Sequence, residues 1–363
     1  MSLYRFRCSG RRDIPIKGST HTWREAPAYD AAELDIAAVV TLVAAGLFGL
    51  VSGFNDGGNL LASFTSGRVV TPPTAAALLL ISLAGPLVIG TAVARTIGVN
   101  IVDLRGEGEL GYVMIVLAPL SVVLLSWRAG IPTSMTLALV GGMLGWVLAS
   151  GGHAVVHWPG VVRVLIGMPA SVFGGGLLAL LVYWGIRKLM GTRPHAAMLE
   201  LARFQLVTAA IQAFAYGAND MEKSVGLIAV GIALGKHSTT VAFSSPIPII
   251  GAFVLFYVGA LVGGWRVASR IGFGVLRVRP VQALAQQLAS GTVVAALATA
   301  GAPVSMTQTI DGGLVGVGAA LRASAVRWGI VREMLGSWLL TLPFAVVVTA
   351  ALHLVIRAAG VAP

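Results

Sequence analysis

Two polar segments of an otherwise apolar chain each centre on the dipeptide Asn-Asp. The residues in them that could bind a cation or a proton are Asn55, Asp56, Asn219, Asp220 and Glu222. An isolated carboxylate in an apolar environment costs about 2.5–3.5 kcal/mol or more, so it normally pairs, takes up a proton or binds a cation. The alternative is that Asn and Asp only cap a half-helix that follows them. Since a neutral cap would serve that purpose and both segments keep Asp beside Asn, we predict a cation- or proton-binding site made of two halves.

Two other segments share the pattern Pro-x-Ser-Met-Thr, at residues 132–136 and 303–307, and Gly-Gly follows each at the same spacing. Proline is favoured in the first turn of a helix, and the free N–H groups of that turn attract anions. The hydroxyls would add donors for a tetrahedral oxyanion, unless they bond back to carbonyls of their own helix. The candidate oxyanion ligands are Ser134, Thr136, Ser305, Thr307 and Gln308, together with Asn59 and Lys223, of which Lys223 has the alternative of pairing with Glu222.

Carboxylates and an oxyanion repel each other, so one site holds both only if protons or cations neutralise the charge. The four segments therefore indicate cotransport of an anion with a cation. Asp311 stands one helical turn beyond Thr307. It is either a third coupling carboxylate or a residue that lines the cavity.

The composition determines where these segments must lie. Of 363 residues, 56% are hydrophobic and 11% are charged, whereas an average soluble domain has roughly 25% charged residues. We therefore predict an all-α, multi-pass protein of the cell membrane, with the lipid bilayer as its surroundings and no cofactor except a coupling ion. A net charge of +11 would suggest a nucleic acid partner for a soluble protein. Here we expect no nucleic acid, because Lys and Arg gather in loops on one side of a membrane.

The uncharged intervals predict the membrane segments, since a spanning helix needs roughly 20 apolar residues. They run over residues 36–55, 69–94, 110–127, 129–162, 164–186, 204–219, 237–265, 280–310 and 334–356. Interval 129–162 is too long for one span, and we interpret it as a re-entrant segment followed by a helix. The pieces 57–67, 224–235 and 312–321 are too short to cross, so we predict half-helices packed inside the protein. In total we expect about ten to twelve transmembrane or re-entrant segments of roughly 20 residues.

The recurrence of the motifs in the same order indicates a duplication. Gly-Phe-Asn-Asp at 53–56 returns as Gly-Ala-Asn-Asp at 217–220, and the Pro-x-Ser-Met-Thr pattern follows in both copies. We place the copies at 34–189 and 199–357, with a polar linker at 190–198 and a basic N-terminal tail at 1–33 that we expect to be disordered. Repeats with interrupted helices are typical of secondary transporters. Equivalent loops of the two copies carry opposite charge, which favours inverted repeats.

The segments at 53–59 and 217–226 are similar to the duplicated signature of the inorganic phosphate transporter (PiT) family, and so are residues 91–103, 303–316 and 324–343. The similarity extends over about residues 36–356. It implies a dimeric inverted-repeat symporter, not an enzyme, that drives phosphate uptake with Na⁺ or H⁺ through an alternating-access site.

The chain departs from the family pattern, which is usually Pro-x-Ser-Ser/Thr-Thr-His/Gln. Met135 and Met306 remove the second hydroxyl, Leu137 replaces the polar sixth residue of the first copy, and Glu222 replaces the usual Gln. These changes leave another oxyanion, such as sulfate, open as the substrate. A membrane-embedded hydrolase is an alternative from another class, although the sequence has neither His-Glu-x-x-His nor Gly-x-Ser-x-Gly. An uncoupled channel is a further alternative.

Overall fold

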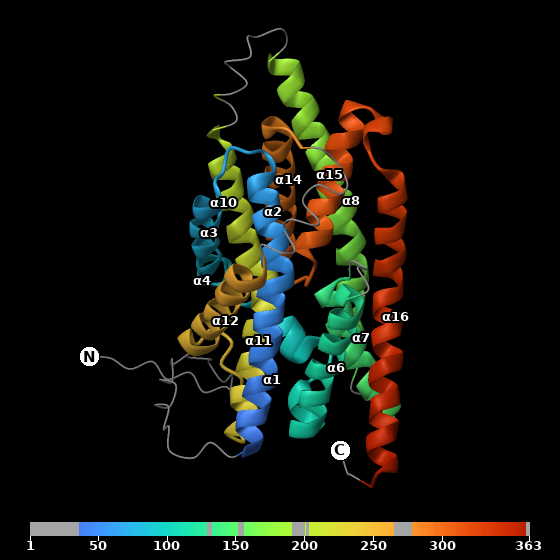
Figure 1. Cartoon of the computed structure of the whole chain (residues 1–363). Coiled ribbons are helices and arrows are strands. Elements are labelled where there is room, and N and C mark those ends of the chain that lie inside the picture. The colour runs from blue at the N-terminus through green and yellow to red at the C-terminus, as the bar shows by residue number, and fades with distance from the viewer. Residues whose placement is uncertain are drawn as a thin grey trace, which may run out of the picture. The chain divides into compact units, whose positions relative to one another are not determined.

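Apolar helices, joined by short π- and 3₁₀-helical turns, make up nearly all of the described chain (Figure 1). This computed structural model describes residues 36–128, 133–151, 156–190, 200, 203–264 and 278–360. Seven helices among them are long and apolar enough to cross a membrane, namely Ile36–Ser66, Pro72–Ile89, Leu104–Ser126, Trp158–Met190, Pro246–Gly264, Pro280–Thr299 and Trp328–Ala358. The prediction of an all-helical membrane protein is confirmed. The predicted tail at 1–33 and most of the linker at 190–198 lie outside the described residues.

The elements that position the candidate site come from both copies. In chain order they are α1 (Ile36–Ser52), η1 (Gly53–Gly57), α2 (Gly58–Ser66), α5 (Ala92–Arg95), α6 (Gly108–Arg128), α7 (Met135–Ala149), α8 (Trp158–Met190), α10 (Gln205–Tyr216), η6 (Gly217–Met221), α11 (Glu222–Gly235), α14 (Pro280–Thr299), α15 (Met306–Leu321) and α16 (Trp328–Ala358). The other elements are α3 (Pro72–Leu78), η2 (Leu79–Leu83), α4 (Ala84–Ile89), η3 (Thr96–Asn100), η4 (Leu104–Glu107), α12 (Pro246–Gly259), η7 (Ala260–Gly264) and η8 (Ala323–Ala325).

The Asn-Asp segments do not interrupt their helices, so the prediction of separate half-helices at 57–67 and 224–235 is wrong. The π-helical turn η1 joins α1 to α2, and the residues that flank it keep right-handed helical dihedral angles. The turn η6 joins α10 to α11 in the same way. A π-helical turn widens a helix by one residue and often occurs at a functional site. Asp56 and Asp220 therefore lie on widened turns inside long helices, and capping does not explain them.

The interruptions lie instead at the two Pro-x-Ser-Met-Thr segments. Ser134 is the N-cap of α7 and Ser305 is the N-cap of α15. Residues 300–305 are not helical, so the uncharged interval 280–310 contains two helices rather than one span. Pro303 precedes the cap and is not in the first turn as predicted, whereas Pro132 lies outside the described residues. Among the described residues, interval 129–162 contains the short helix α7 and only the first turns of α8, which continues through the interval 164–186. The second helix predicted inside 129–162 is therefore not a separate element.

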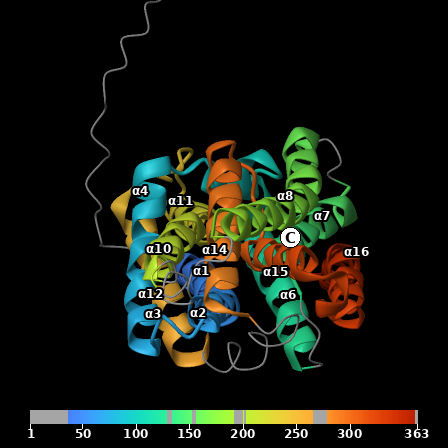
Figure 2. The same ribbon diagram turned by 90° about the horizontal axis from the view of Figure 1, so that it is seen from above.

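The described helices of residues 34–363 belong to one compact unit, in which helices of the two predicted copies pack against each other. Helix α1 packs against α11, and α2 contacts α10. Helix α14 lies between α10 and α8, while α15 packs on α8 and α7 packs on α16. In the view of Figure 2, α3, α4 and α12 lie on one side of α1 and α16 lies on the other. The Asn-Asp turns thus lie in the interior, between helices of both copies.

The glycine of the second Asn-Asp segment allows close packing of η6 on η2. A Cβ atom added at Gly217 would lie 1.8 Å from the carbonyl oxygen of Ser82, and backbone atoms cannot yield easily. We expect Gly217→Ala to cost about 1–3 kcal/mol or more and to lower the thermal unfolding midpoint of the detergent-purified protein. Gly336→Ala is the control, because a Cβ there meets nothing within 4 Å. Equal unfolding midpoints for the two variants would contradict this steric argument.

Candidate functional site

The Asp56 carboxylate is 5% exposed and accepts hydrogen bonds from both copies. Asn55 Nδ2 donates to its Oδ1 at 2.9 Å, and Ser52 Oγ donates to its Oδ2 at 3.2 Å. From the start of α15, Thr307 Oγ1 donates to Oδ1 at 3.2 Å. Asn59 Nδ2, one turn along α2, donates to the same Thr307 hydroxyl at 3.1 Å. The first Asn-Asp segment is therefore bonded to the helix start of the second copy.

The Asp220 carboxylate is 2% exposed and lies between a lysine and a helix N-terminus. Lys223 Nζ donates to its Oδ1 at 2.7 Å, and the backbone N–H of Met306 donates to its Oδ2 at 3.1 Å. The same ammonium donates to Thr136 Oγ1 at 2.6 Å and to the Val304 carbonyl at 2.5 Å. An ammonium has three donors, so all of them are used here, and Lys223 ties the helix starts of α7 and α15 to one carboxylate.

One contact recurs in both halves of the site. Asn59 and Lys223 follow their Asn-Asp dipeptides at the same spacing. Each donates to the threonine of a helix start, Asn59 to Thr307 and Lys223 to Thr136. In both cases that threonine belongs to the other predicted copy. Each half-site therefore contains residues of both copies.

The two half-sites also meet directly. Ser52 Oγ and Tyr216 Oη are 3.2 Å apart, and these residues precede the two π-helical turns. The start of α15 also links the two aspartates, because Thr307 donates to Asp56 and the Met306 N–H donates to Asp220. Sequence reasoning missed Ser52 and Tyr216, although each stands immediately before the glycine of its motif.

The serine hydroxyls at the helix starts remain able to donate to an anion. Ser134 Oγ accepts from the Leu137 N–H and Ser305 Oγ accepts from the Gln308 N–H, each at 3.4 Å. An accepting hydroxyl keeps its own O–H as a donor. Thr136 donates to the Val304 carbonyl rather than back to its own helix, so the alternative of local back-bonding does not describe it.

Glu222 faces away from the carboxylates that it was predicted to join. Its Oε2 accepts from the backbone N–H groups of Val93 at 3.0 Å and Ala94 at 3.1 Å. It therefore holds the first turn of α5 against α11. The alternative of a Lys223–Glu222 pair is wrong, because Lys223 forms its ion pair with Asp220.

Asn219 and Asp311 take no part in the hydrogen bonds that join Asp56 and Asp220 to the helix starts. Asn219 donates to the Ala302 carbonyl at 2.9 Å and accepts from the Val304 N–H at 3.0 Å. Both ends of its amide thus fix the non-helical segment that leads into α15. Asp311 lines a pocket together with Asn59, one helical turn from Thr307.

A layer of buried glutamines adjoins the site, and sequence reasoning missed it. Ser63 Oγ lies 2.8 Å from Gln212 Oε1 and 2.9 Å from Gln286 Oε1. Gln287 Nε2 donates to the Ser63 carbonyl at 2.8 Å, and Gln212 Nε2 donates to Ser290 Oγ at 2.6 Å. The spacing of Gln286 and Ser290 places both on one helix face, and such residues inside an apolar span require partners. That spacing was the available signal.

The sequence model of the "Phosphate transporter family" matches residues 52–202 and 192–349. The chain belongs to the phosphate transporter family. A relative from Mycobacterium tuberculosis (strain H37Rv), named "Probable low-affinity inorganic phosphate transporter", is 33% identical over 318 residues, 85% of this chain and 74% of the relative. A Bacillus subtilis relative of the same name is 28% identical over 335 residues, 89% of this chain and 99% of the relative.

The fold of this phosphate transporter family member is also that of a solved protein described as "The sodium-dependent phosphate transporter". The TM-score is 0.78 at 19% identity, over 89% of this chain and 99% of the other. The family and its named relatives are transporters, so the chain is a multi-pass transporter of the cell membrane and not a membrane-embedded hydrolase.

Proposed function

We propose that this family member is a secondary active symporter, which carries inorganic phosphate together with Na⁺ or H⁺ through one alternating-access site. The observation that carries the proposal is the bonding of each buried aspartate to a helix start. Asp56 accepts from Thr307, and Asp220 accepts from the Met306 N–H. Carboxylates and an anion that use the same donors must be neutralised together, and a bound cation or proton does this.

In this proposal, the coupling ion is bound by Asp56 and Asp220, with the side-chain oxygen of Asn55 beside them. Asn219 and Glu222 act by positioning, since their hydrogen bonds go to the segment before α15 and to α5. The name of the solved relative, a sodium-dependent transporter, makes Na⁺ the first coupling ion to test.

Phosphate is proposed to bind at the facing N-termini of α7 and α15. Helix N-termini attract anions through their free N–H groups. The candidate donors are the hydroxyls of Ser134 and Ser305, the amide of Gln308 and the ammonium of Lys223. Thr136, Thr307 and Asn59 already donate to other groups, so each would first exchange such a bond. Lys223 already uses three acceptors, so it would exchange one of them when it contacts an anion.

Alternating access follows from the proposed inversion of the two copies. The packing of α1 on α11 and of α2 on α10 supports inversion, because these continuous helices then run antiparallel. Transporters with inverted repeats open to either side when one repeat rocks against the other. We propose a homodimer as the assembly, in which the exposed apolar side chains of α8 and α16 contact lipid or the second copy.

The purified protein in proteoliposomes tests this function directly. We expect labelled phosphate to accumulate only under an imposed Na⁺ or pH gradient, and to equilibrate without accumulation when the gradient is collapsed. Sulfate is the matched competing substrate, because Met135 and Met306 leave fewer hydroxyls for the anion. If sulfate accumulates faster than phosphate, sulfate is the substrate. If phosphate enters equally with and without gradients, the protein is a channel.

A further inference from the structure

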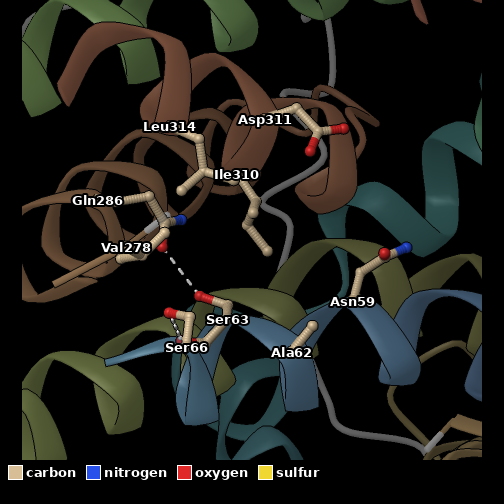
Figure 3. A pocket seen from close by; sticks show the side chains of 9 residues that line it. All are labelled: Asn59, Ala62, Ser63, Ser66, Val278, Gln286, Ile310, Asp311 and Leu314. Carbon is tan, nitrogen blue, oxygen red and sulfur yellow. Dashed lines mark hydrogen bonds between the residues drawn. The ribbon is translucent and has the colours of Figure 1, made fainter. Parts of the chain in front are cut away.

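A pocket with polar and apolar walls extends from the site between α2, α14 and α15. Two of the residues that line it have side-chain oxygen atoms without a hydrogen-bond partner among the described residues. Its polar lining comes from Asn59, Ser63, Ser66, Gln286 and Asp311 (Figure 3). Asn59, Ser63 and Ser66 follow one another along α2, and Asp311 stands on α15 one turn beyond Thr307. The pocket thus continues the site in one direction along two helices.

Asp311 brings an uncompensated carboxylate into this pocket. It is 5% exposed, and among the described residues no hydrogen bond or ion pair reaches its carboxylate. Among the described residues, those that line the pocket include no lysine, arginine or histidine. A buried carboxylate without a partner is unfavourable unless a cation or a proton joins it.

Asn59 supplies the second, independent observation. Its Nδ2 is held by the Thr307 hydroxyl and by the Asn55 carbonyl, each at 3.1 Å. Its Oδ1 is buried and has no partner in the described part of the chain. In Figure 3 the side chain of Asn59 rises from α2 toward the helix that carries Asp311. An amide oxygen fixed in this way adds a neutral ligand to the carboxylate.

Two further polar residues of the pocket wall are held by hydrogen bonds. Gln286 and Ser63 belong to the glutamine layer, in which Ser63 also bonds Gln212 and Gln287. Their oxygens are therefore held in place by hydrogen bonds in the wall of the same pocket. Hard monovalent and divalent cations prefer such sets of carboxylate, amide and hydroxyl oxygens. With one carboxylate in the set, a single positive charge neutralises it.

We propose that Asp311 and Asn59 bind one monovalent metal cation, at a position separate from Asp56 and Asp220 and one helical turn from Thr307. The proposal rests on the proposed cotransport. It adds a second cation site to the one that Asp56 and Asp220 form. A cation there neutralises a carboxylate near the phosphate-binding threonine, so its presence favours phosphate binding.

The other copy provides an internal comparison, because it lacks this site. Spacing from the shared motifs places Leu227, Val230 and Val140 where the first set has Ser63, Ser66 and Asp311. All three are 0% exposed, and the Tyr112 hydroxyl donates to the Leu227 carbonyl. The equivalent space is apolar and filled. The extra cation site therefore exists on one side of the phosphate site only.

Binding of radiolabelled Na⁺ to the purified full-length protein tests the proposal without any transport. We expect Asp311→Asn to bind one Na⁺ fewer per chain than the unaltered protein. Thr309→Val is the matched control on α15, since the Thr309 hydroxyl only bonds back to the Ser305 carbonyl. It should bind the full number. Equal Na⁺ numbers and affinities for Asp311→Asn and Thr309→Val would overturn the proposal.

Transport separates this proposal from the function on which it rests. In proteoliposomes, Asp311→Asn should still accumulate phosphate, with a half-saturating Na⁺ concentration raised about tenfold. If the unaltered protein accumulates no phosphate but Asp311→Asn still loses one Na⁺, the proposed function fails and the cation site stands. If Asp311→Asn does not fold, Asp311→Ser provides the same comparison with a smaller side chain.

Discussion

Asp56→Asn is expected to abolish gradient-driven phosphate accumulation, with a loss of at least about 100-fold in initial rate. Asparagine keeps the size of the side chain but cannot carry the negative charge that binds the coupling ion. It also brings an amide group toward donors, because Asn55, Ser52 and Thr307 all donate to the carboxylate. The measurement is labelled phosphate uptake into proteoliposomes under Na⁺ and pH gradients.

Asp103→Asn is the matched control for Asp56→Asn. Asp103 is a partly exposed carboxylate outside the site, and the neighbouring Arg105 guanidinium holds its pKa below the usual value. Its loss should leave phosphate uptake within about twofold, since exposed ion pairs contribute roughly 0–1 kcal/mol. Full gradient-driven uptake by a correctly folded Asp56→Asn protein would reject the assignment of Asp56 to the coupling ion.

Lys223→Met is expected to give the largest loss of stability among substitutions in the site. Asp220 and Lys223 form a buried ion pair, and this substitution removes its positive member. Removal of one member of a buried ion pair costs about 3–5 kcal/mol. The Thr136 hydroxyl and the Val304 carbonyl lose the same donor. We expect a lower thermal unfolding midpoint and no phosphate uptake.

The double variant Asp220→Asn with Lys223→Met separates stability from function. It removes both charges, so we expect the unfolding midpoint to return most of the way to that of the unaltered protein. Phosphate uptake should stay absent, because the coupling carboxylate is missing. A double variant as unstable as Lys223→Met alone would show that the lysine acts through packing rather than through charge.

Residue types and spacing predicted the membrane class and most of the residues that gather at the site. An unpaired carboxylate in an apolar helix is unfavourable, so the sequence alone identified Asp56, Asp220 and Asp311 as candidates. The duplicated motifs added Thr136 and Thr307, which the helices bring against Lys223 and Asn59.

The errors concern local geometry that residue types do not encode. A π-helical turn and a helix break both suit a polar Gly-x-Asn-Asp segment, and the packing of α1–α2 and α10–α11 selects the continuous helix. Glu222 is close to Asp220 in sequence. Its carboxylate nevertheless binds the free N–H groups at the start of α5 instead of joining the site. The glutamine layer was missed because its members are separated by long stretches of chain.

The exchange of contacts between copies has a consequence for biosynthesis. The hydrogen bond from Thr307 to Asp56 joins residues 251 positions apart. At translation rates of about 5–20 residues per second, the first copy waits roughly 10 to 50 seconds for that partner. Throughout this interval the Asp56 carboxylate has only the donors of its own segment, Ser52 and Asn55, so the nascent helix must keep it at the bilayer surface or inside the insertion machinery. Ribosome pausing or a slow translocon would lengthen that exposure, so maturation of this transporter should depend on the late delivery of its C-terminal half.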